Sequence, residues 1–486
     1  MATAAPPVPT GISRTFLIVW AGQVVSLLGT NLTGFALAIW VFQGTGSVTQ
    51  LALVLMAVAV PGIILGPFAG VYADRFDRRV VMLVTDGIAG VASLGLAAAF
   101  FFGDLTMWQI VVATGISSAA QAFQEPAYLA AIPTLVSQDR LGRANGLVQL
   151  GPAVGMLVAP AIAGALLLTL GVWAVLAIDV VTFLVAVGTL AIVRFPPVPR
   201  TTVASESSVW QEAKTGFRYL LDRPGMFRLI MVFAGVNLLF GFVNVLYAPL
   251  FLSYANEAVV GAVLSVAGLG MVLGSVAMSV WGGPKRRVLG LIVMLSGMGV
   301  FIAISGVRPS LTAAAIGATG VMFIVPLANG TGQSLWQVKV ELDMQGRVFS
   351  TRRMLSVAAA PLAYVLAGPL ADNVFEPAMA EGGALSGVLG PVLGTGTGRG
   401  IGAMFVFVGL GALVLAVVSL LDPKIRNIER DYPDIAMPED APDDPFASES
   451  AEQPAQARDA RPAAGGIPDP APATVRGPDP SRWSPS

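Results

Sequence analysis

The sequence predicts an all-α polytopic membrane protein whose twelve transmembrane helices form two pseudo-symmetric six-helix bundles. Of its 486 residues, 55% are hydrophobic and only 12% are charged, whereas charged residues make up about a quarter of a soluble domain. Apolar runs of about 20 residues, the length that a helix needs to cross a bilayer, recur along the chain. The second half of the sequence also repeats features of the first, which predicts two related bundles.

The apolar runs are separated by charged or Gly/Pro-rich interruptions and give the expected helices in chain order. They are 15–43, 48–73, 79–102, 106–135, 144–169, 172–195, 226–252, 258–281, 287–306, 311–336, 348–371 and 401–421. Each run is continuously apolar, whereas the strands of a membrane β-barrel alternate. We therefore expect an N-terminal bundle over 14–195 and a C-terminal bundle over 226–421.

Three polar segments flank these bundles. Residues 1–13 are read as a cytoplasmic tail and 196–225 as a cytoplasmic linker. The tail 422–486 is rich in Pro, Ala, Asp and Glu, so we expect it to be disordered. The stretch GTGTGRG at 394–400 lacks the preceding strand and the GKS/T ending of a phosphate-binding loop. It is expected to be a flexible linker outside the membrane.

Lys and Arg predict the orientation, because they concentrate in cytoplasmic loops. If both termini are cytoplasmic, all 28 basic residues except Arg308 and Arg399 fall in cytoplasmic segments. The opposite orientation would place nearly all of them outside. We therefore expect both termini in the cytoplasm.

An internal repeat supports the division into halves. GPFAGVYADRFDRRVVML at 66–83 aligns with GSVAMSVWGGPKRRVLGL at 274–291, 208 residues later. Gly142-Arg143 likewise has a counterpart in Gly346-Arg347. Parallel repeats of this kind are typical of one large class of secondary transporters.

Amide side chains inside the spans concentrate on every third helix. The first, fourth, seventh and tenth helices carry Gln23, Asn31, Gln121, Gln124, Asn237, Asn244, Asn329, Gln333 and Gln337. Because unsatisfied polar groups are costly in lipid, four polar helices predict a water-filled cavity. The alternative for any single amide is a hydrogen bond between packed helices. The candidate substrate contacts are Gln23, Asn31, Gln121, Asn237, Asn244, Asn329 and Gln333.

Three carboxylates fall inside spans: Asp86, Glu125 and Asp179. Intramembrane acids are functional candidates, and the chain has neither His nor Cys, so any proton chemistry must use carboxylates. Glu125 shares a helix face with Gln121 and precedes Pro126, which weakens the backbone ladder. It is the preferred proton-coupling residue, with Asp86 and Asp179 as further candidates. The alternatives are structural pairing for the two aspartates and contact with water or an arginine for Glu125.

A charged cluster, GVYADRFDRRVV at 70–81, follows the second helix. The pattern Gly70-x-x-x-Asp74-Arg75-x-x-Arg78-Arg79 resembles the loop signature of the major facilitator superfamily. Asp77 stands where that signature often has glycine. A loop that is merely positive inside the cell would explain the arginines but not an aspartate at the membrane edge.

The resemblance implies a conformational latch. Asp74 would pair across neighbouring helix ends and hold the outward-open state, with Arg75, Arg78 and Arg79 as partners or lipid-facing anchors. The second copy has Gly282 where Asp74 should align. Only one half is therefore expected to carry the complete latch.

The fifth helix carries a second family-like pattern. Gly146, Gly155, Pro160 and Gly164 have the spacing of the antiporter signature of drug exporters, with alanine at two usual glycine positions. Small residues allow helices to approach closely, and proline bends them. Ordinary helix packing is the alternative. The arginine that many proton-coupled drug antiporters carry on the fourth helix is missing.

Three longer stretches resemble a drug-and-siderophore exporter branch that includes macrolide-efflux and enterobactin-exporter relatives. They are QEPAYLAAIPTLVSQDRLGRANGL, LWQVKVELDMQGRVFSTRRM and PLAYVLAGPLADNVFEPAM. The resemblance covers roughly 14–421 and implies a monomer in the bacterial plasma (inner) membrane, in contact with lipid. Members of this branch often accompany nonribosomal peptide synthesis.

The expected function is export of an amphipathic small organic molecule by proton antiport through alternating access. A dedicated exporter of a siderophore or nonribosomal peptide product is one alternative. A polytopic lipid-modifying enzyme is another, although the sequence shows no clustered catalytic groups. No enzyme activity, cofactor, metal or nucleic-acid partner is expected, and the cargo and coupling stoichiometry stay open.

Overall fold

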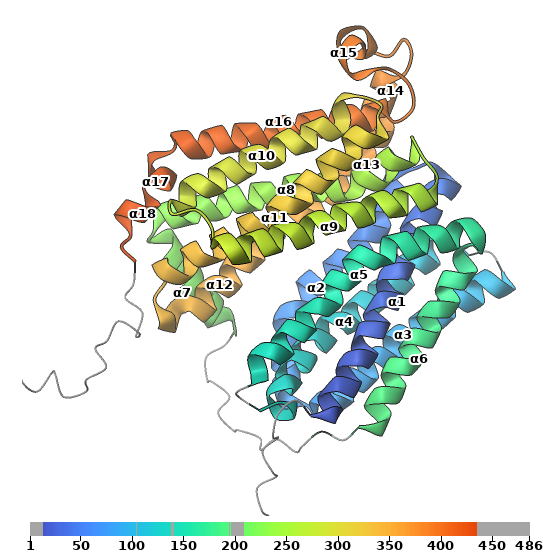
Figure 1. Ribbon diagram of the computed structural model, residues 1–486, viewed down its shortest axis with the longest axis vertical. Coiled ribbons are helices and arrows are strands. Elements are labelled where there is room, and N and C mark those ends of the chain that lie inside the picture. The colour runs from blue at the N-terminus through green and yellow to red at the C-terminus, as the bar shows by residue number, and fades with distance from the viewer. Residues whose placement is uncertain (1–12, 104, 138–139, 194, 196–208, 435–486) are drawn as a thin grey trace, which may run out of the picture. The chain divides into compact units, whose positions relative to one another are not determined.

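The computed structural model describes residues 13–103, 105–137, 140–193, 195 and 209–434 (Figure 1). Within these ranges the chain is helical and contains no β-strand. Eleven of the described helical segments are long and apolar enough to cross a membrane. The predicted fourth span is also a continuous helix, Met107–Leu135, but it carries the polar group Gln121, Gln124 and Glu125. The all-α polytopic fold is confirmed.

Six helices form the N-terminal half. They are α1 (Arg14–Thr45), α2 (Val48–Arg75), α3 (Arg78–Phe102), α4 (Met107–Leu135), α5 (Leu141–Thr169) and α6 (Val172–Ile192). Helix α1 packs on α5 and α6, and α3 packs on α4 and α6. Asp77 caps α3, because its side chain accepts a hydrogen bond from Val80 N.

The C-terminal half begins after a short helix in the predicted linker, α7 (Val209–Leu221). Its spanning helices are α8 (Pro224–Leu252), α9 (Glu257–Trp281), α10 (Arg287–Val307), α11 (Leu311–Lys339), α12 (Leu342–Val357) with α13 (Ala360–Leu370), and α16 (Arg399–Leu421). Helix α10 packs on α11 and α16, and α8 packs on α13 and α16.

The sequence predicts the eleventh span as one continuous helix, but in the structure this span is divided into two helices. Helix α12 ends at Val357 and α13 begins at Ala360. The break follows from Pro361, which has no N–H to donate to the carbonyl of Val357. After α13 the chain continues through a π turn, Ala371–Phe375, into α14 (Glu376–Met379).

The first part of the predicted tail packs on the C-terminal half. Two single-turn helices, α17 (Pro423–Arg426) and α18 (Ile428–Asp431), bury Ile425 and Ile428. Lys339 donates hydrogen bonds to the carbonyls of Glu429 and Tyr432. For residues 422–434 the expectation of disorder is therefore wrong, because two apolar anchors and a buried lysine hold them. Residues 435–486 lie outside the described part of the chain.

The outer surface of the helices is apolar. Val91, Leu184 and Val280 are 70%, 66% and 84% exposed. A continuous apolar surface on a chain this large needs a nonaqueous environment, which a bilayer supplies. Below, the end of each helix that the charge distribution predicts to face outside is called its outer end, and the opposite end its inner end.

Candidate functional site

The two halves meet where α5 crosses α9. An added Cβ at Gly164 would lie 2.5 Å from the carbonyl oxygen of Glu257, and one at Gly261 would lie 2.1 Å from that of Pro160. Ala161 N donates to Ser265 Oγ at 3.1 Å. Main chain therefore packs against main chain here, and only glycine fits. These contacts involve the outer portions of both helices.

The second contact between the halves joins α2 to α13. An added Cβ at Gly368 would lie 2.3 Å from Cα of Thr49. Nearby, the Gln43 side-chain amide donates to the carboxylate of Glu257, which begins α9. The two seams, α5/α9 and α2/α13, together close the outer ends of the halves.

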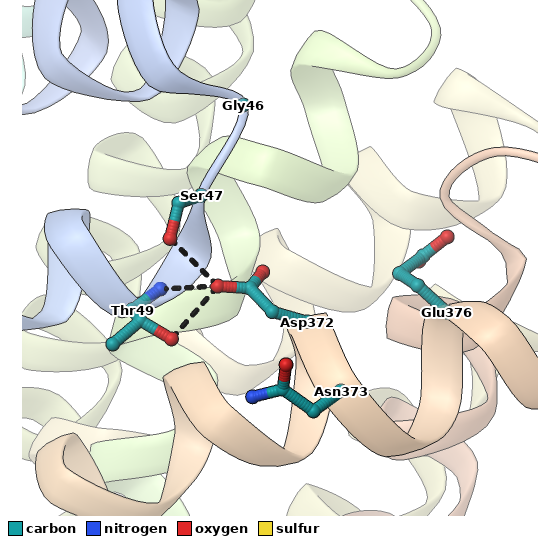
Figure 2. A pocket seen from close by; sticks show the side chains of 6 residues that line it. All are labelled: Gly46, Ser47, Thr49, Asp372, Asn373 and Glu376. Atoms are coloured by element: carbon teal, nitrogen blue, oxygen red, sulfur yellow. Dashed lines mark hydrogen bonds between the residues drawn. The ribbon is translucent and has the colours of Figure 1, made fainter.

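A carboxylate of the C-terminal half caps the first turn of α2. Asp372, in the π turn after α13, accepts hydrogen bonds from Ser47 Oγ at 2.7 Å and Val48 N at 3.0 Å. It also accepts from Thr49 N at 2.9 Å and Thr49 Oγ1 at 2.7 Å. Figure 2 shows the carboxylate pointing at this turn. An anion at a helix N-terminus satisfies free N–H groups and the helix dipole.

The Asp372 carboxylate borders a pocket of about 430 Å³. The pocket is lined by Gly46, Ser47, Thr49, Asp372, Asn373 and Glu376 (Figure 2). Glu376 faces its own half, where it accepts hydrogen bonds from Gly398 N and Ile401 N at the start of α16. Of the two acids, therefore, Asp372 reaches across to the N-terminal half.

Asp86 lies inside the N-terminal half and is fully buried. Gln23 Nε2 of α1 donates to Asp86 Oδ2 at 2.8 Å. Gln124 Nε2 of α4 donates to Asp86 Oδ1 and also to Gln23 Oε1, the latter at 2.6 Å. The structure thus brings together one predicted proton-coupling candidate and one predicted cavity contact. Gln23 is engaged between helices in this arrangement.

Asp179 of α6 is also buried, at 2% exposure. Its Oδ2 accepts a hydrogen bond from Ser93 Oγ of α3 at 2.6 Å. The buried hydroxyl of Thr33 on α1 faces the same carboxyl and acts on it as a second hydrogen-bonding group. An added Cβ at Gly29 would lie 2.9 Å from Asp179 Oδ1, so α1 passes directly over this acid.

Glu125 and Gln121 are both exposed on α4. The large apolar side chains exposed near the outer end of α4 are Trp108, Val112 and Ile116. Glu125 follows Ile116 by nine residues, which at 3.6 residues per turn places it on about the opposite side of the helix. Glu125 thus lies away from the apolar exposed stripe, while the preceding Gln124 points to Asp86.

The other predicted cavity amides behave differently from one another. Asn31, Asn237 and Asn244 donate to carbonyls one turn earlier in their own helices, at 2.9, 2.9 and 3.0 Å. Gln333 accepts from Arg352 at 2.9 Å. Asn329 and Asn244 are exposed. Those two side chains stay open to a ligand, whereas Gln333 is held by an arginine that sequence reasoning did not single out.

The predicted cytoplasmic latch is described only in part. Gly70, Asp74 and Arg75 belong to α2, but their side chains lie outside the described residues. Arg78 donates to the carbonyl of Ala130 at 2.7 Å. Arg79 donates to the carbonyls of Leu190 and Ala191, each at 2.8 Å. In this arrangement the two arginines tie together the inner ends of α3, α4 and α6, where cations complement helix C-termini.

The antiporter-type residues of α5 contact different neighbours at different positions along the helix. Gly164 and Pro160 lie at the seam with α9, as described above. An added Cβ at Gly155 would meet Asn31 Nδ2 of α1 at 2.6 Å, whereas one at Gly146 would meet open space. Three of the four positions thus have a packing reason for a small or bent residue.

Sequence reasoning missed Asp372 and the place of Arg399. Asp372 follows the expected end of the eleventh span at 371, so it was not considered. Arg399, expected in a flexible linker, is 2% exposed. It donates to Tyr254 Oη and to the carbonyl of Gly306, both at 2.6 Å. Gly394, Gly396 and Gly398 before it have φ of +84°, +103° and +78°, a backbone that favours glycine.

Two helical halves whose described contacts lie toward one end, with polar groups on the helices between them, are typical of secondary transporters. The family model of the Major Facilitator Superfamily matches residues 19–364, and the chain belongs to that family. This confirms the resemblance predicted from the loop signature.

Curated relatives and solved structures agree with this assignment. The chain is 28% identical over 368 residues to Macrolide efflux protein A of Streptococcus pyogenes, covering 74% of this chain and 90% of that protein. It is 27% identical over 295 residues to Enterobactin exporter EntS of Escherichia coli, covering 60% and 68%. A bacterial homologue of the lysosomal transporter Spinster, inward-facing, matches with TM-score 0.64, 15% identity and coverage of 87% and 98%. A bacterial homologue of ferroportin, also inward-facing, matches with TM-score 0.59, 15% identity and coverage of 83% and 98%.

Proposed function

We propose that this transporter exports an amphipathic small organic molecule from the bacterial cytoplasm by proton antiport. The observation that carries the proposal is that the contacts described between the halves, α5 with α9 and α2 with α13, lie toward their outer ends. With both termini in the cytoplasm, this arrangement is inward-facing, so cargo enters from inside. The relatives named for macrolide efflux and enterobactin export support the outward direction.

Alternating access then requires the outer seams to part. Rocking one half against the other would separate α5 from α9 and α2 from α13, while the inner ends close. Asp372 holds the outer end closed in the present state, and Asp74 is proposed to hold the inner end closed in the opposite one. The transporter works as a monomer, because one chain supplies both halves.

The cargo contacts lie on helices that face the space between the halves. Gln121 on α4, Asn244 on α8 and Asn329 on α11 are exposed amides. Amides both donate and accept, so they suit neutral polar groups of a cargo whose remaining surface is apolar. Glu125, on the same face as Gln121, adds one negative charge. This combination favours amphipathic molecules that are neutral or cationic.

The proton couples to cargo through Glu125 in this proposal. A carboxylate can bind either a proton or a cationic group of the cargo, and competition between the two links opposite fluxes. Glu125→Gln keeps the shape and removes the charge. We expect it to abolish cargo-dependent proton movement in proteoliposomes, measured with a trapped pH dye. Glu381→Gln, an exposed acid in the loop between α14 and α15, is the matched control and should behave like the parent.

A dedicated siderophore or nonribosomal-peptide-product exporter is the second candidate function. The enterobactin exporter among the relatives favours it. Competition assays distinguish the two: a broad panel of unrelated amphipathic drugs should slow efflux if recognition is broad, whereas only catechol- or peptide-type compounds should do so if it is dedicated. A lipid-product assay on the same liposomes tests the enzymatic alternative, for which we expect no product.

A further inference from the structure

Arg352 of the eleventh span carries a partly buried guanidinium that has no acidic partner. It lies on α12, ten residues after the first residue of that helix, Leu342. None of the ion pairs in the described part of the chain includes Arg352. A charge inside a membrane span is costly, and such groups face a partner, a water-filled cavity or a substrate path. Arg352 is therefore a candidate for binding a negatively charged group from outside the chain.

Three side chains hold the guanidinium in a fixed orientation. Arg352 Nη2 donates to Gln333 Oε1 at 2.9 Å. The central guanidinium carbon lies 5.4 Å from the ring centre of Trp336 and 5.5 Å from that of Phe349, which are cation–π distances. Arg352 donates no other hydrogen bond to the residues that the structure describes. Because a guanidinium has five N–H donors in one plane, most of its donors remain free for a second acceptor.

The guanidinium lies on the polar face of α11. The opposite side of α11 packs on α10, where an added Cβ at Gly320 would lie 2.3 Å from a side chain of that helix. Gly330 packs against α9 and Gly332 against α8. At 3.6 residues per turn, Gln333 falls between the directions of these two glycines. Since α9 contacts α5 of the N-terminal half, the face that holds Arg352 borders the space between the halves.

Polar side chains continue along this face on both sides of Gln333. Gln333 precedes the last residue of α11, Lys339, by six residues, or about 9 Å along the helix. Gln337, one turn nearer the inner end, is exposed, and so is Asn329, one turn farther from it. A cargo that enters from the cytoplasm therefore meets the guanidinium before it reaches Asn329.

We propose that Arg352 binds an acidic group of the cargo and so helps to determine the substrate class. The proposal deepens the proposed export function and rests on it. Arginine binds a carboxylate or another oxyanion through two parallel hydrogen bonds, for which Arg352 has free donors. Glu125 of the N-terminal half supplies the opposite charge. The cargo is then an amphipathic molecule with both an acidic and a basic group, neutral overall.

A phospholipid headgroup offers the same anionic chemistry, but the surroundings of Arg352 favour cargo. The guanidinium lies on a face that carries three amides, Asn329, Gln333 and Gln337. Amides suit the polar groups of a solute, whereas lipid-facing surfaces avoid unsatisfied polar groups. The acidic group that Arg352 receives therefore belongs to a molecule between the halves rather than to the surrounding bilayer.

The first test compares two probes that differ only in the acidic group. They are ε-dansyl-lysine, a zwitterion, and its carboxamide, which lacks the carboxylate. Their binding to the full chain in detergent micelles is followed by dansyl fluorescence. We expect the parent to bind the acid at least about tenfold more tightly than the amide, as the loss of a charge-assisted pair implies. Equal binding of the two probes, or no binding of either, overturns the proposal.

Two variants assign this preference to one side chain. Arg352→Gln should bind the acid and the amide equally. Arg353→Gln removes the exposed arginine next to it on the same helix and is the matched control, which should keep the preference of the parent. A preference for the acid that persists in Arg352→Gln, or that is lost equally in both variants, overturns the assignment.

A third variant keeps the proposal testable if Arg352→Gln folds poorly. Gln333→Glu retains Arg352 but places a carboxylate at the oxygen that Arg352 already contacts. The resulting ion pair should preserve the fold and neutralise the guanidinium. We expect Gln333→Glu to lose the preference for the acid, whereas Arg352→Lys, which keeps the charge but not the planar fork, should retain part of it. An unchanged preference in Gln333→Glu overturns the proposal.

The same measurements separate the proposal from a lipid site and from antiport. If phosphatidylglycerol binds in an Arg352-dependent manner while the two probes bind equally, the ligand is a lipid phosphate and the proposal is overturned. Binding in micelles needs no proton gradient. If the acid preference depends on Arg352 but the parent shows no proton flux in proteoliposomes, the proposal on cargo recognition stands and antiport fails. If antiport is present and the probes do not respond to Arg352, antiport stands and the cargo proposal fails.

Discussion

The Asp372 cap predicts that a single neutralising substitution will open the outer ends. In Asp372→Asn the side chain keeps its size but loses its charge, and an amide group replaces one acceptor oxygen. Three of the four hydrogen bonds converge on Oδ2 and one on Oδ1. Whichever oxygen is replaced, an NH₂ group then faces donors of α2.

The magnitude follows from these contacts. Hydrogen bonds to charged groups contribute about 1.5–3 kcal/mol, and a charge at a helix N-terminus adds about 0.3–1 kcal/mol. Asparagine retains part of the hydrogen bonding and part of the interaction with the helix dipole, because its side-chain carbonyl still accepts hydrogen bonds. A net loss of about 2 kcal/mol shifts the ratio of outer-closed to outer-open molecules by roughly 30-fold.

Spin-label distance measurement by double electron–electron resonance reports that shift. The chain has no cysteine, so Leu170→Cys and Arg308→Cys introduce two clean labelling sites, both exposed at outer helix ends of opposite halves. We expect Asp372→Asn to add longer distances to the distribution. Asn373→Ala, an exposed neighbour that lines the same pocket, is the control and should match the parent. An unchanged distance distribution in Asp372→Asn would falsify the role of Asp372 in holding the outer ends closed.

Three further predictions follow from the packing. Gly261→Ala should hinder outer closure and slow transport, because its Cβ would overlap the carbonyl oxygen of Pro160; distance measurement on the same label pair checks it. Arg399→Ala should lower the melting temperature in detergent by removing two charge-assisted hydrogen bonds, with a loss of about 2–4 kcal/mol; an unchanged melting curve would contradict this. Burial raises the pKa of Asp422, but hydrogen bonds from Arg228 and from backbone N–H groups outweigh it and hold that pKa below its ordinary 3.8. The contribution of Asp422 to stability should therefore be complete above about pH 4 and be lost as the pH falls through the pKa that Asp422 has in the folded protein. The melting temperature of Asp422→Asn, measured against pH, should lack this acid-dependent loss.

The helices could be predicted because lipid imposes length and hydrophobicity on each of them separately. The hydrophobicity pattern failed to predict helix boundaries where a single residue type, such as proline, ends a helix. Pro361 divides the eleventh span into α12 and α13, although its surroundings are as apolar as the rest. Ile425 and Ile428 were too few to predict folding of the segment after 421, since their anchoring depends on a surface formed by other helices.

The sequence identified the polar residues of the candidate site but could not predict which of them would contact one another. Asp86, Gln23 and Gln124 are each conspicuous as polar groups within apolar runs. Their meeting depends on how α1, α3 and α4 rotate about their axes, which periodicity within one helix cannot define. Asp372 was missed for a different reason: it acts across the two halves from a position that hydrophobicity alone assigns to a loop.

The outer seam between α5 and α9 closes on backbone atoms of Gly164 and Gly261 rather than on matched side chains. Closure at this seam therefore depends on main-chain contact, whereas the cargo contacts proposed above are side chains of α4, α8 and α11. If cargo binds there, a substitution that alters the cargo range on those helices would leave the contacts of the α5/α9 seam unchanged. Gly164 and Gly261 are then the positions where a side chain of any size would prevent the two halves from meeting, whatever the cargo.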